Sequence, residues 1–283
     1  MYPSKTVYFS KMESMGNDFV IFDGLRQSIP ALSTQSIVHL GHRRFGVGFD
    51  QLLILEPPLA PEHDFRLKIY NADGSEARQC GNGARCTVQF AYEHGLCPKR
   101  MLLIETLSGP IQGVATPDGM IDVCLGTPKA YEALPNLWDN APMAYFVDLG
   151  NPHCVILQQT IDENLLATWG ERLQQHPRFP DGINLTFLHH IDAQRLKVRT
   201  FERGVGLTPS CGSGASAAAI VAIRELAAQP VLSVEAGCGH LTIRWDQEHE
   251  RVHLIGAVTT VFEGSLELKV HPNEPPVSEF CDQ

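Results

Sequence analysis

Two cysteines lie in nearly the same short motif, and both motifs suit acid–base chemistry. Cys80-Gly-Asn-Gly-Ala and Cys211-Gly-Ser-Gly-Ala each run from a loop into an apolar segment that predicts a helix. The glycines allow successive backbone N–H groups to point outward at the helix start, which forms an anion site. The positive end of a helix also favours thiolate over thiol. Each motif therefore combines a proton-transfer group with a place for a carboxylate.

Two thiols that flank one bound carboxylate suit proton abstraction at the adjacent carbon. One thiolate would remove the α-proton, the helix N–H groups would stabilise the enolate-like charge, and the opposite thiol would return a proton to the other face. The overall reaction is racemisation or epimerisation. We expect no cofactor, because the sequence has no lysine in an obvious pyridoxal phosphate setting and no Gly-x-Gly-x-x-Gly or Walker loop.

The two motifs belong to an internal repeat. Gly16-Asn-Asp-Phe resembles Gly150-Asn-Pro-His, 134 positions later. The two cysteines lie 131 positions apart, and Asn71 aligns with Glu202 at that same offset. The same landmarks in the same order predict two homologous domains. A pseudo-two-fold axis between them would bring the two cysteine loops face to face across an interdomain cleft.

The elements that must position these loops are mainly strands. Segments that alternate or carry β-branched residues lie between Gly and Pro breaks in both halves. Helices are expected at 33–41 and 84–93 and, in the second half, at 162–174 and 215–226. The predicted fold class is α/β (α+β), with two pseudo-symmetric domains, each a curved, mostly antiparallel sheet around a central helix.

Length and charge set the expected domains and partners. A chain of 283 residues is near the upper size of one core, which favours two domains. A net charge of −10 without a long basic run argues against a nucleic-acid partner. We place the first domain at 1–128, with strands at about 257–270 packing back onto it, the second at 129–256, and a tail at 271–283.

The cellular setting is predicted from segments that the sequence lacks. No signal peptide is visible, and no window holds 18 consecutive apolar residues, so we expect no membrane partner. Eight cysteines without a Cys-x-x-Cys pair favour reduced thiols in the cytoplasm. Cys80-x5-Cys86 has the wrong spacing for the usual structural zinc sites, so we expect no metal. A small molecule is the expected partner.

The longer motifs around both cysteines resemble those of a known enzyme family. Asn71-Ala-Asp-Gly-Ser-Glu-Ala-Arg-Gln-Cys80-Gly-Asn-Gly-Ala-Arg-Cys86, Gly150-Asn-Pro-His-Cys154 and Glu202-Arg-Gly-Val-Gly-Leu-Thr-Pro-Ser-Cys211-Gly-Ser-Gly-Ala215 are similar to motifs of diaminopimelate epimerase. The resemblance implies that fold, a homodimer in which Phe262 is a contact, and interconversion of LL- and meso-2,6-diaminopimelate on the route to lysine and peptidoglycan.

The resemblance also implies the roles of single residues. Cys80 and Cys211 would be the catalytic acid/base pair, while His153 and Glu202 would tune the thiols. The substrate would be bound by the side chains of Asn17, Gln51, Asn71, Asn151, Asn184, Glu202 and Arg203, and by backbone N–H groups of Gly81, Asn82, Gly212 and Ser213. An arginine can bind a carboxylate through two hydrogen bonds and a glutamate can accept from an ammonium, so both ends of a diamino diacid could be recognised.

Two alternatives stay open at this point. One is a racemase of the same architecture that acts on proline, hydroxyproline or histidine. The other is a binding or redox protein in which Cys80 and Cys211 form a switchable disulfide. Glu13-Ser14, where the family usually has His-Gly, and Leu207, in place of an acidic residue, are the two departures from the family pattern.

Overall fold

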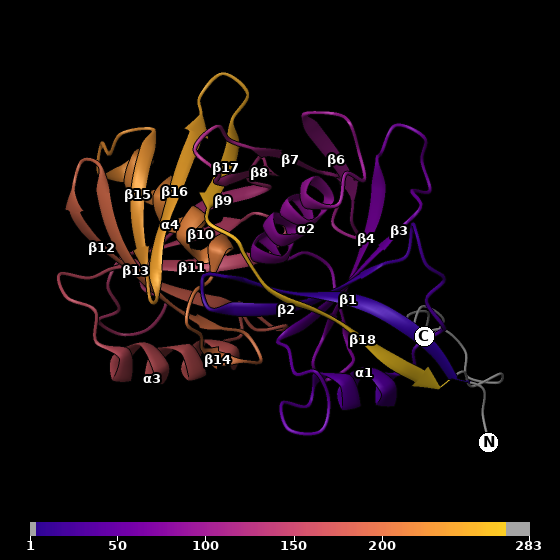
Figure 1. Cartoon of the computed structure of the whole chain (residues 1–283). Helices are drawn as coiled ribbons and strands as arrows, with labels where there is room; N and C mark the ends of the chain where they lie inside the picture. The colour runs from indigo at the N-terminus through magenta and orange to yellow at the C-terminus, as the bar shows by residue number, and fades with distance from the viewer. Residues whose placement is uncertain (1–3, 270–283) are drawn as a thin grey trace. The chain divides into compact units, whose positions relative to one another are not determined.

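The computed structural model describes residues 4–269, and the expected tail at 271–283 lies outside the described residues. Strands predominate in this mixed α/β chain, and four helices occur in the described part (Figure 1). The chain divides into two compact units. One contains the residues up to Ile121 and those from Val258 onward, and the other is Asp122–Ala257.

The first unit is a sheet that combines antiparallel and parallel pairs. Strand β18 pairs antiparallel with β1, β1 antiparallel with β2, β2 parallel with β3, β3 antiparallel with β4, β4 parallel with β6, and β6 antiparallel with β7. The elements are β1 (Ser4–Ser14), β2 (Asn17–Asp23), α1 (Thr34–Gly41), β3 (Gln51–Glu56), β4 (Phe65–Asn71), β5 (Glu76–Ala77), α2 (Gly81–Glu93), β6 (Met101–Glu105), β7 (Ile111–Ala115) and β18 (Thr259–Lys269).

The second unit repeats the pairing order of the first. From β10 to β16 the successive pairs are antiparallel, parallel, antiparallel, parallel and antiparallel, as they are from β1 to β7. The elements are β8 (Ile121–Gly126), β9 (Ala130–Leu134), β10 (Ala144–Asp148), β11 (Pro152–Leu157), α3 (Glu163–Gln174), β12 (Asn184–Asp192), β13 (Arg195–Glu202), β14 (Gly206–Leu207), α4 (Gly212–Glu225), β15 (Val231–Ala236), β16 (Gly239–Asp246) and β17 (Arg251–Gly256).

Helix starts follow from capping side chains. Ser33 accepts from the backbone N–H of Ser36 and begins α1, and Asp162 caps α3 in the same way. The two central helices begin earlier than the sequence predicted, at Gly81 rather than 84 and at Gly212 rather than 215. The glycines that indicated a loop form the first helical turn, because packing against the surrounding sheet outweighs their low helix propensity.

Each central helix is surrounded by strands of its own unit. Helix α2 contacts β1, β2, β3 and β7, and α4 contacts β10 to β13 and β15 to β17. Helix α4 is buried along most of its length, and its alanines at 217, 218 and 219 are completely inaccessible. A helix that is apolar on all sides must be buried. The packing therefore fixes the N-terminal turn of each helix, where the cysteine lies.

The part of the chain that the structure describes, residues 4–269, contains no helix with the length and apolar character needed to cross a membrane.

Candidate active site

In the first unit, Cys80 caps the N-terminus of the central helix. Its backbone is extended, with φ −147° and ψ 114°, and its Sγ accepts the backbone N–H of Gly83 at 3.3 Å. Gly81 and Asn82 follow in the first turn, where backbone N–H groups have no partner within the helix. A half-buried thiol at the positive end of a helix is in an environment that favours its anion.

A carboxylate network orients the nearest amide toward this thiol. Cys80 Sγ donates to Asn17 Oδ1 at 4.0 Å, and Asn17 Nδ2 donates to Asp50 at 2.7 Å. Arg43 binds Asp50 at 2.6 Å and Asp18 through two hydrogen bonds of 2.7 and 3.0 Å. Although burial acts to raise it, hydrogen bonds from Arg43 and Lys11 hold the pKa of Asp18 far below its ordinary value. The network therefore stays charged and keeps the amide oxygen on the thiol side.

Strand ends bring the other amides of this unit together. Because β2 and β3 are parallel and β4 is antiparallel to β3, the start of β3 lies beside the end of β4. Gln51, the first residue of β3, donates from Nε2 to Asn71 Oδ1 at 2.9 Å, and Asn71 is the last residue of β4. Gln51 Oε1 is buried and has no hydrogen-bond partner among the described residues. It is an acceptor that an ammonium group could use.

In the second unit, a chain of hydrogen bonds runs from the equivalent cysteine. Cys211 caps α4, and its Sγ lies 3.5 Å from Ser213 Oγ. Ser213 Oγ in turn lies 2.9 Å from His153 Nε2 and accepts from Asn151 Nδ2 at 3.2 Å. Gly212 and Ser213 both belong to the first helical turn. The serine hydroxyl thus links the thiol to two residues near the start of β11.

The chain of contacts continues to the end of β13. Asn184, at the start of β12, donates to Asn151 Oδ1 at 2.8 Å and accepts the backbone N–H of Arg203 at 2.9 Å. The Arg203 side chain donates to the Asp181 carbonyl at 3.2 Å. Beside it, Gly182 has φ +73°, and an added Cβ there would lie 3.1 Å from Arg203 Cδ. A side chain at position 182 would therefore crowd that of Arg203.

Charge and burial favour the protonated form of Cys211. Burial raises the pKa of this thiol well above its ordinary value, and the negative charge of Glu202 acts in the same direction. Burial also raises the pKa of Glu202, although hydrogen bonds from Thr208, at 2.5 Å, and from Cys211 oppose that shift. Burial and the positive charge of Arg203 lower the pKa of His153 to about 3, so its imidazole is neutral near pH 7.

The structure thus gathers the predicted site residues into two clusters, one in each unit. Asp50, Arg43 and Thr208 support these clusters and were not predicted from the sequence. A signal for Asp50 exists, because it occupies the repeat position of Asn184, 134 positions later. The expected interdomain arrangement of the two clusters stays a prediction.

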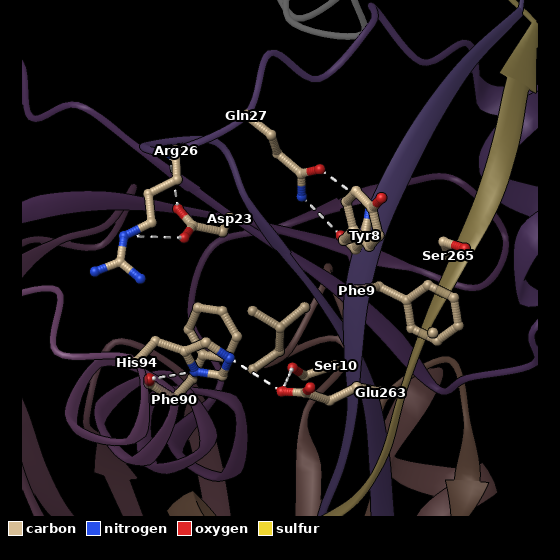
Figure 2. Close-up of a pocket in the computed structure, with 12 residues that line it drawn as sticks. Tyr8, Phe9, Ser10, Asp23, Arg26, Gln27, Phe90, His94, Glu263 and Ser265 are labelled. Carbon is tan, nitrogen blue, oxygen red and sulfur yellow. Dashed lines mark hydrogen bonds and ion pairs between the residues drawn. The ribbon is translucent and has the colours of Figure 1, made fainter.

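A separate hollow of about 620 Å³ lies in the first unit and contains none of the predicted site residues (Figure 2). Several of its polar side chains are paired with neighbours. Gln27 binds the backbone N–H and carbonyl of Tyr8 at 3.0 and 2.7 Å, and His94 Nε2 lies 3.1 Å from Glu263.

Comparisons with known proteins agree with the motifs at both cysteines. A family model described as diaminopimelate epimerase matches residues 9–130 and 145–261. A diaminopimelate epimerase of Aromatoleum aromaticum is 41% identical over 274 residues, which cover 92% of this chain and 98% of that protein. One from Ectopseudomonas mendocina is 39% identical over 273 residues, with 92% and 99% covered.

Solved structures share the fold at lower sequence identity. A phenazine biosynthesis protein of the PhzF family from Enterococcus faecalis aligns with a TM-score of 0.68 at 17% identity, covering 93% of this chain and all of that one. A hydroxyproline epimerase from Agrobacterium vitis gives 0.67 at 15%, with 96% and 95% covered. The predicted fold class is confirmed, and the sequence matches make the assignment more specific: this chain belongs to the diaminopimelate epimerase family.

Proposed function

We propose that this protein interconverts LL- and meso-2,6-diaminopimelate through two thiols that act on opposite faces of one carbon. The observation that carries the proposal is the pair of N-cap cysteines. Cys80 and Cys211 each begin a buried central helix. Cys80 contacts the amide of Asn17, and Cys211 contacts Ser213, to which the amide of Asn151 donates. The names of the relatives supply the substrate.

The chemistry is a proton transfer in two steps. A thiolate takes the α-proton, and the electrons of the broken C–H bond move onto the carboxylate to give an enediolate. The opposite thiol then donates its proton to the other face of the carbon. Backbone N–H groups of Gly81, Asn82, Gly212 and Ser213, in the two first helical turns, stabilise the negative charge as it develops.

Recognition of the distal centre needs one group of each charge. Arg203 binds a carboxylate through two hydrogen bonds, and Glu202 accepts from an ammonium. Neutral donors and acceptors complete the site: Asn17, Gln51, Asn71, Asn151 and Asn184. His153 stays neutral and holds Ser213 in place.

The decisive experiment measures exchange of the α-hydrogen. Purified protein is incubated in D2O with LL-diaminopimelate, proline, hydroxyproline and histidine, and deuterium at Cα is followed by NMR. We expect deuterium in early meso-diaminopimelate, with little in recovered LL substrate, because the opposing thiol is equilibrated with solvent beforehand. Equal label in both pools would contradict a two-thiol mechanism. Exchange into proline, hydroxyproline or histidine alone would support the racemase alternative, and no exchange at all would support the redox alternative.

We further propose a homodimer in the cytoplasm, on the route to lysine and peptidoglycan, with neither nucleic acid nor a membrane as partner. Tyr8, Val261 and Phe262 are large apolar side chains on β1 and β18, and each is about half exposed or more. Eight cysteines without a Cys-x-x-Cys pair support a reducing compartment. Sedimentation of the wild type and of Phe262→Asp tests the dimer. A monomeric wild type would contradict it.

A further inference from the structure

Arg85 places a buried positive charge at the N-terminal end of α2. Its side chain is completely inaccessible to solvent. Helical side chains lean toward the N-terminus of their helix, so a long side chain from position 85 reaches back toward the first turn. Its Nη2 donates to Asn82 Oδ1 and to Ser14 Oγ, both at 2.8 Å. The guanidinium therefore lies against the turn that begins at Cys80.

Among the described residues, this cation forms no ion pair, and Glu13 is the one carboxylate that acts on it electrostatically. Its two side-chain hydrogen bonds go to a neutral amide and a neutral hydroxyl, and within residues 4–269 its Nε and Nη1 have no hydrogen-bond partner. Burial lowers the pKa of Arg85 to about 10, which leaves it charged near pH 7. A buried charge without an opposite charge is costly, so an anion close to Arg85 would be favoured.

Three titratable groups interact electrostatically with Arg85: Cys86, Cys80 and Glu13. Burial raises the pKa of Cys86 well above its ordinary value, so it stays a thiol. Glu13 is half-buried on β1 and accepts the backbone N–H of Gly16 at 2.8 Å. Cys80 already accepts a backbone N–H at the positive end of the helix. Of Cys80 and Cys86, Cys80 is thus the thiol placed to become an anion.

The other charged groups near Cys80 pair with one another. Asn17 Oδ1 accepts from the Cys80 thiol, Asn17 Nδ2 donates to Asp50, and Asp50 and Asp18 both bind Arg43. Lys11 forms a further ion pair with Asp18. This network balances its own charges, and Arg85 does not belong to any of its ion pairs.

The second unit has no cation at the repeat position of Arg85. The residue 131 positions after Arg85 is Ser216, which is also completely buried. Its hydroxyl donates to the Gly212 carbonyl of its own helix at 2.9 Å. The charged side chain that bonds to Cys211 is Glu202, an acid. One thiol thus lies near a cation and the other beside a carboxyl group.

We propose that Arg85 is a positioning residue that makes Cys80 the thiolate of the resting enzyme and leaves the shared proton on Cys211. The inference rests on the proposed function, since a two-thiol reaction must start with one base and one acid. No oxidation or reduction is involved. Arg85 acts through Cys80 and does not contact the substrate.

The test measures how alkylation of each thiol depends on pH. Full-length wild-type protein, Arg85→Met and Arg85→Lys are treated briefly with iodoacetamide between pH 5 and 10, and each cysteine peptide is quantified by mass spectrometry. In the wild type, the alkylation midpoint of Cys80 should lie below that of Cys211. In Arg85→Met the Cys80 midpoint should rise by about one pH unit or more, because an opposite charge nearby typically shifts a titration by about 1 to 3 units. Arg85→Lys should retain most of the wild-type midpoint.

Midpoints are compared rather than rates, because burial alone slows the alkylation of Cys211. Ser216→Ala is the matched control at the repeat position, and it should leave the Cys80 midpoint unchanged. A folded Arg85→Met protein with an unchanged Cys80 midpoint would overturn the proposal. If that variant does not fold, a wild-type Cys211 midpoint at or below that of Cys80 would overturn it as well.

Kinetics supply a second readout for the same variants. The acidic limb of kcat/KM, which reports ionisation of the base, should move to higher pH in Arg85→Met and stay near its wild-type position in Arg85→Lys. The alkylation experiment uses no substrate. Failure of α-hydrogen exchange would therefore refute the proposed function while the order of the two alkylation midpoints could still be measured.

Discussion

Helices α2 and α4 begin in the same way but differ in the charges around their first turns. Each starts at an N-cap cysteine with extended backbone, followed by glycine. In α2, the thiol accepts a backbone N–H, and a buried arginine lies one turn further on. In α4, the position equivalent to that arginine holds Ser216, and the thiol contacts a serine and a glutamate. The repeated backbone carries opposite electrostatic environments.

This difference shows how a symmetric scaffold can support an asymmetric starting state. Two identical sites would share a proton equally, and half of the molecules would hold it on the wrong thiol for a given substrate. A cation near Cys80 and a carboxyl group beside Cys211 remove that degeneracy while leaving both helix N-termini available. The repeat therefore gives both thiols the same backbone geometry, and the residues that differ between the two units favour the proton on Cys211.

The largest expected effect comes from removing either thiol. Cys80→Ala and Cys211→Ala should each reduce kcat at least about a hundredfold, because a general acid or base contributes about 10² to 10⁴. Turnover is measured by NMR, with circular dichroism as the check on folding. Cys86→Ala, at a buried thiol of α2 outside the proposed chemistry, is the control. Near-wild-type turnover in a folded Cys80 or Cys211 variant would refute the assignment of that thiol.

Substitution of Arg203 tests whether the second unit alone binds the distal carboxylate. Its position 131 residues earlier holds Ala72, so the first unit has no equivalent cation there. Arg203→Lys keeps the charge and loses the bidentate geometry, so KM for diaminopimelate should rise about tenfold. Steady-state kinetics measure the change. An unchanged KM would place Arg203 outside the substrate site.

Glu202 acts on Cys211 in the opposite direction to that proposed for Arg85 on Cys80. The negative charge of Glu202 acts to raise the pKa of Cys211. Glu202→Gln should therefore lower the alkylation midpoint of Cys211, the opposite of the shift expected for Cys80 when Arg85 is replaced. The Cys80 midpoint in the same sample is the internal control. A Cys211 midpoint that rises or does not move would contradict this account of the second thiol.

The smallest expected effect is on stability. The pKa of His153 is lowered from 6.5 to about 3 by burial and by Arg203, so only the unfolded chain binds a proton there between these values. The unfolding free energy should therefore fall as pH drops below about 6.5, by about 2 kcal/mol at pH 5. Urea titrations at pH 5.0 and 8.0 measure this difference. His153→Gln should lose most of it, and an unaltered pH dependence in that variant would contradict the assignment.

The sequence predicts those features of the fold that depend on repeats or on nearby residues. The repeat predicted two halves, and the structure shows the same order of strand pairing in both. Ser33 and Asp162 marked helix starts, because a capping side chain acts within three residues. The starts of α2 and α4 were predicted too late, since a glycine-rich turn that is held by tertiary packing has no local helix signal.

The site was harder to predict where it depends on contacts distant in sequence. Asn17 and Asn151 stand out because they repeat, yet Arg43 is 26 positions from Asn17 and reaches it only through Asp50. Arg85 lies in the Cys80 motif, but its burial and its hydrogen bond to Ser14 of β1 depend on tertiary packing and could not be predicted from the local sequence. The catalytic and binding roles themselves stay predictions.

Strand β18 also determines the order in which this protein can fold during synthesis. It pairs along nearly the whole of β1, from Ser4↔Lys269 to Glu13↔Thr259. The ribosome makes β1 first and β18 only after the entire second unit, which is continuous from Asp122 to Ala257. The second unit can therefore fold as the chain emerges. The first must wait with one edge of β1 unpaired, and that edge is the place where a nascent chain would recruit a chaperone or pair wrongly with another copy.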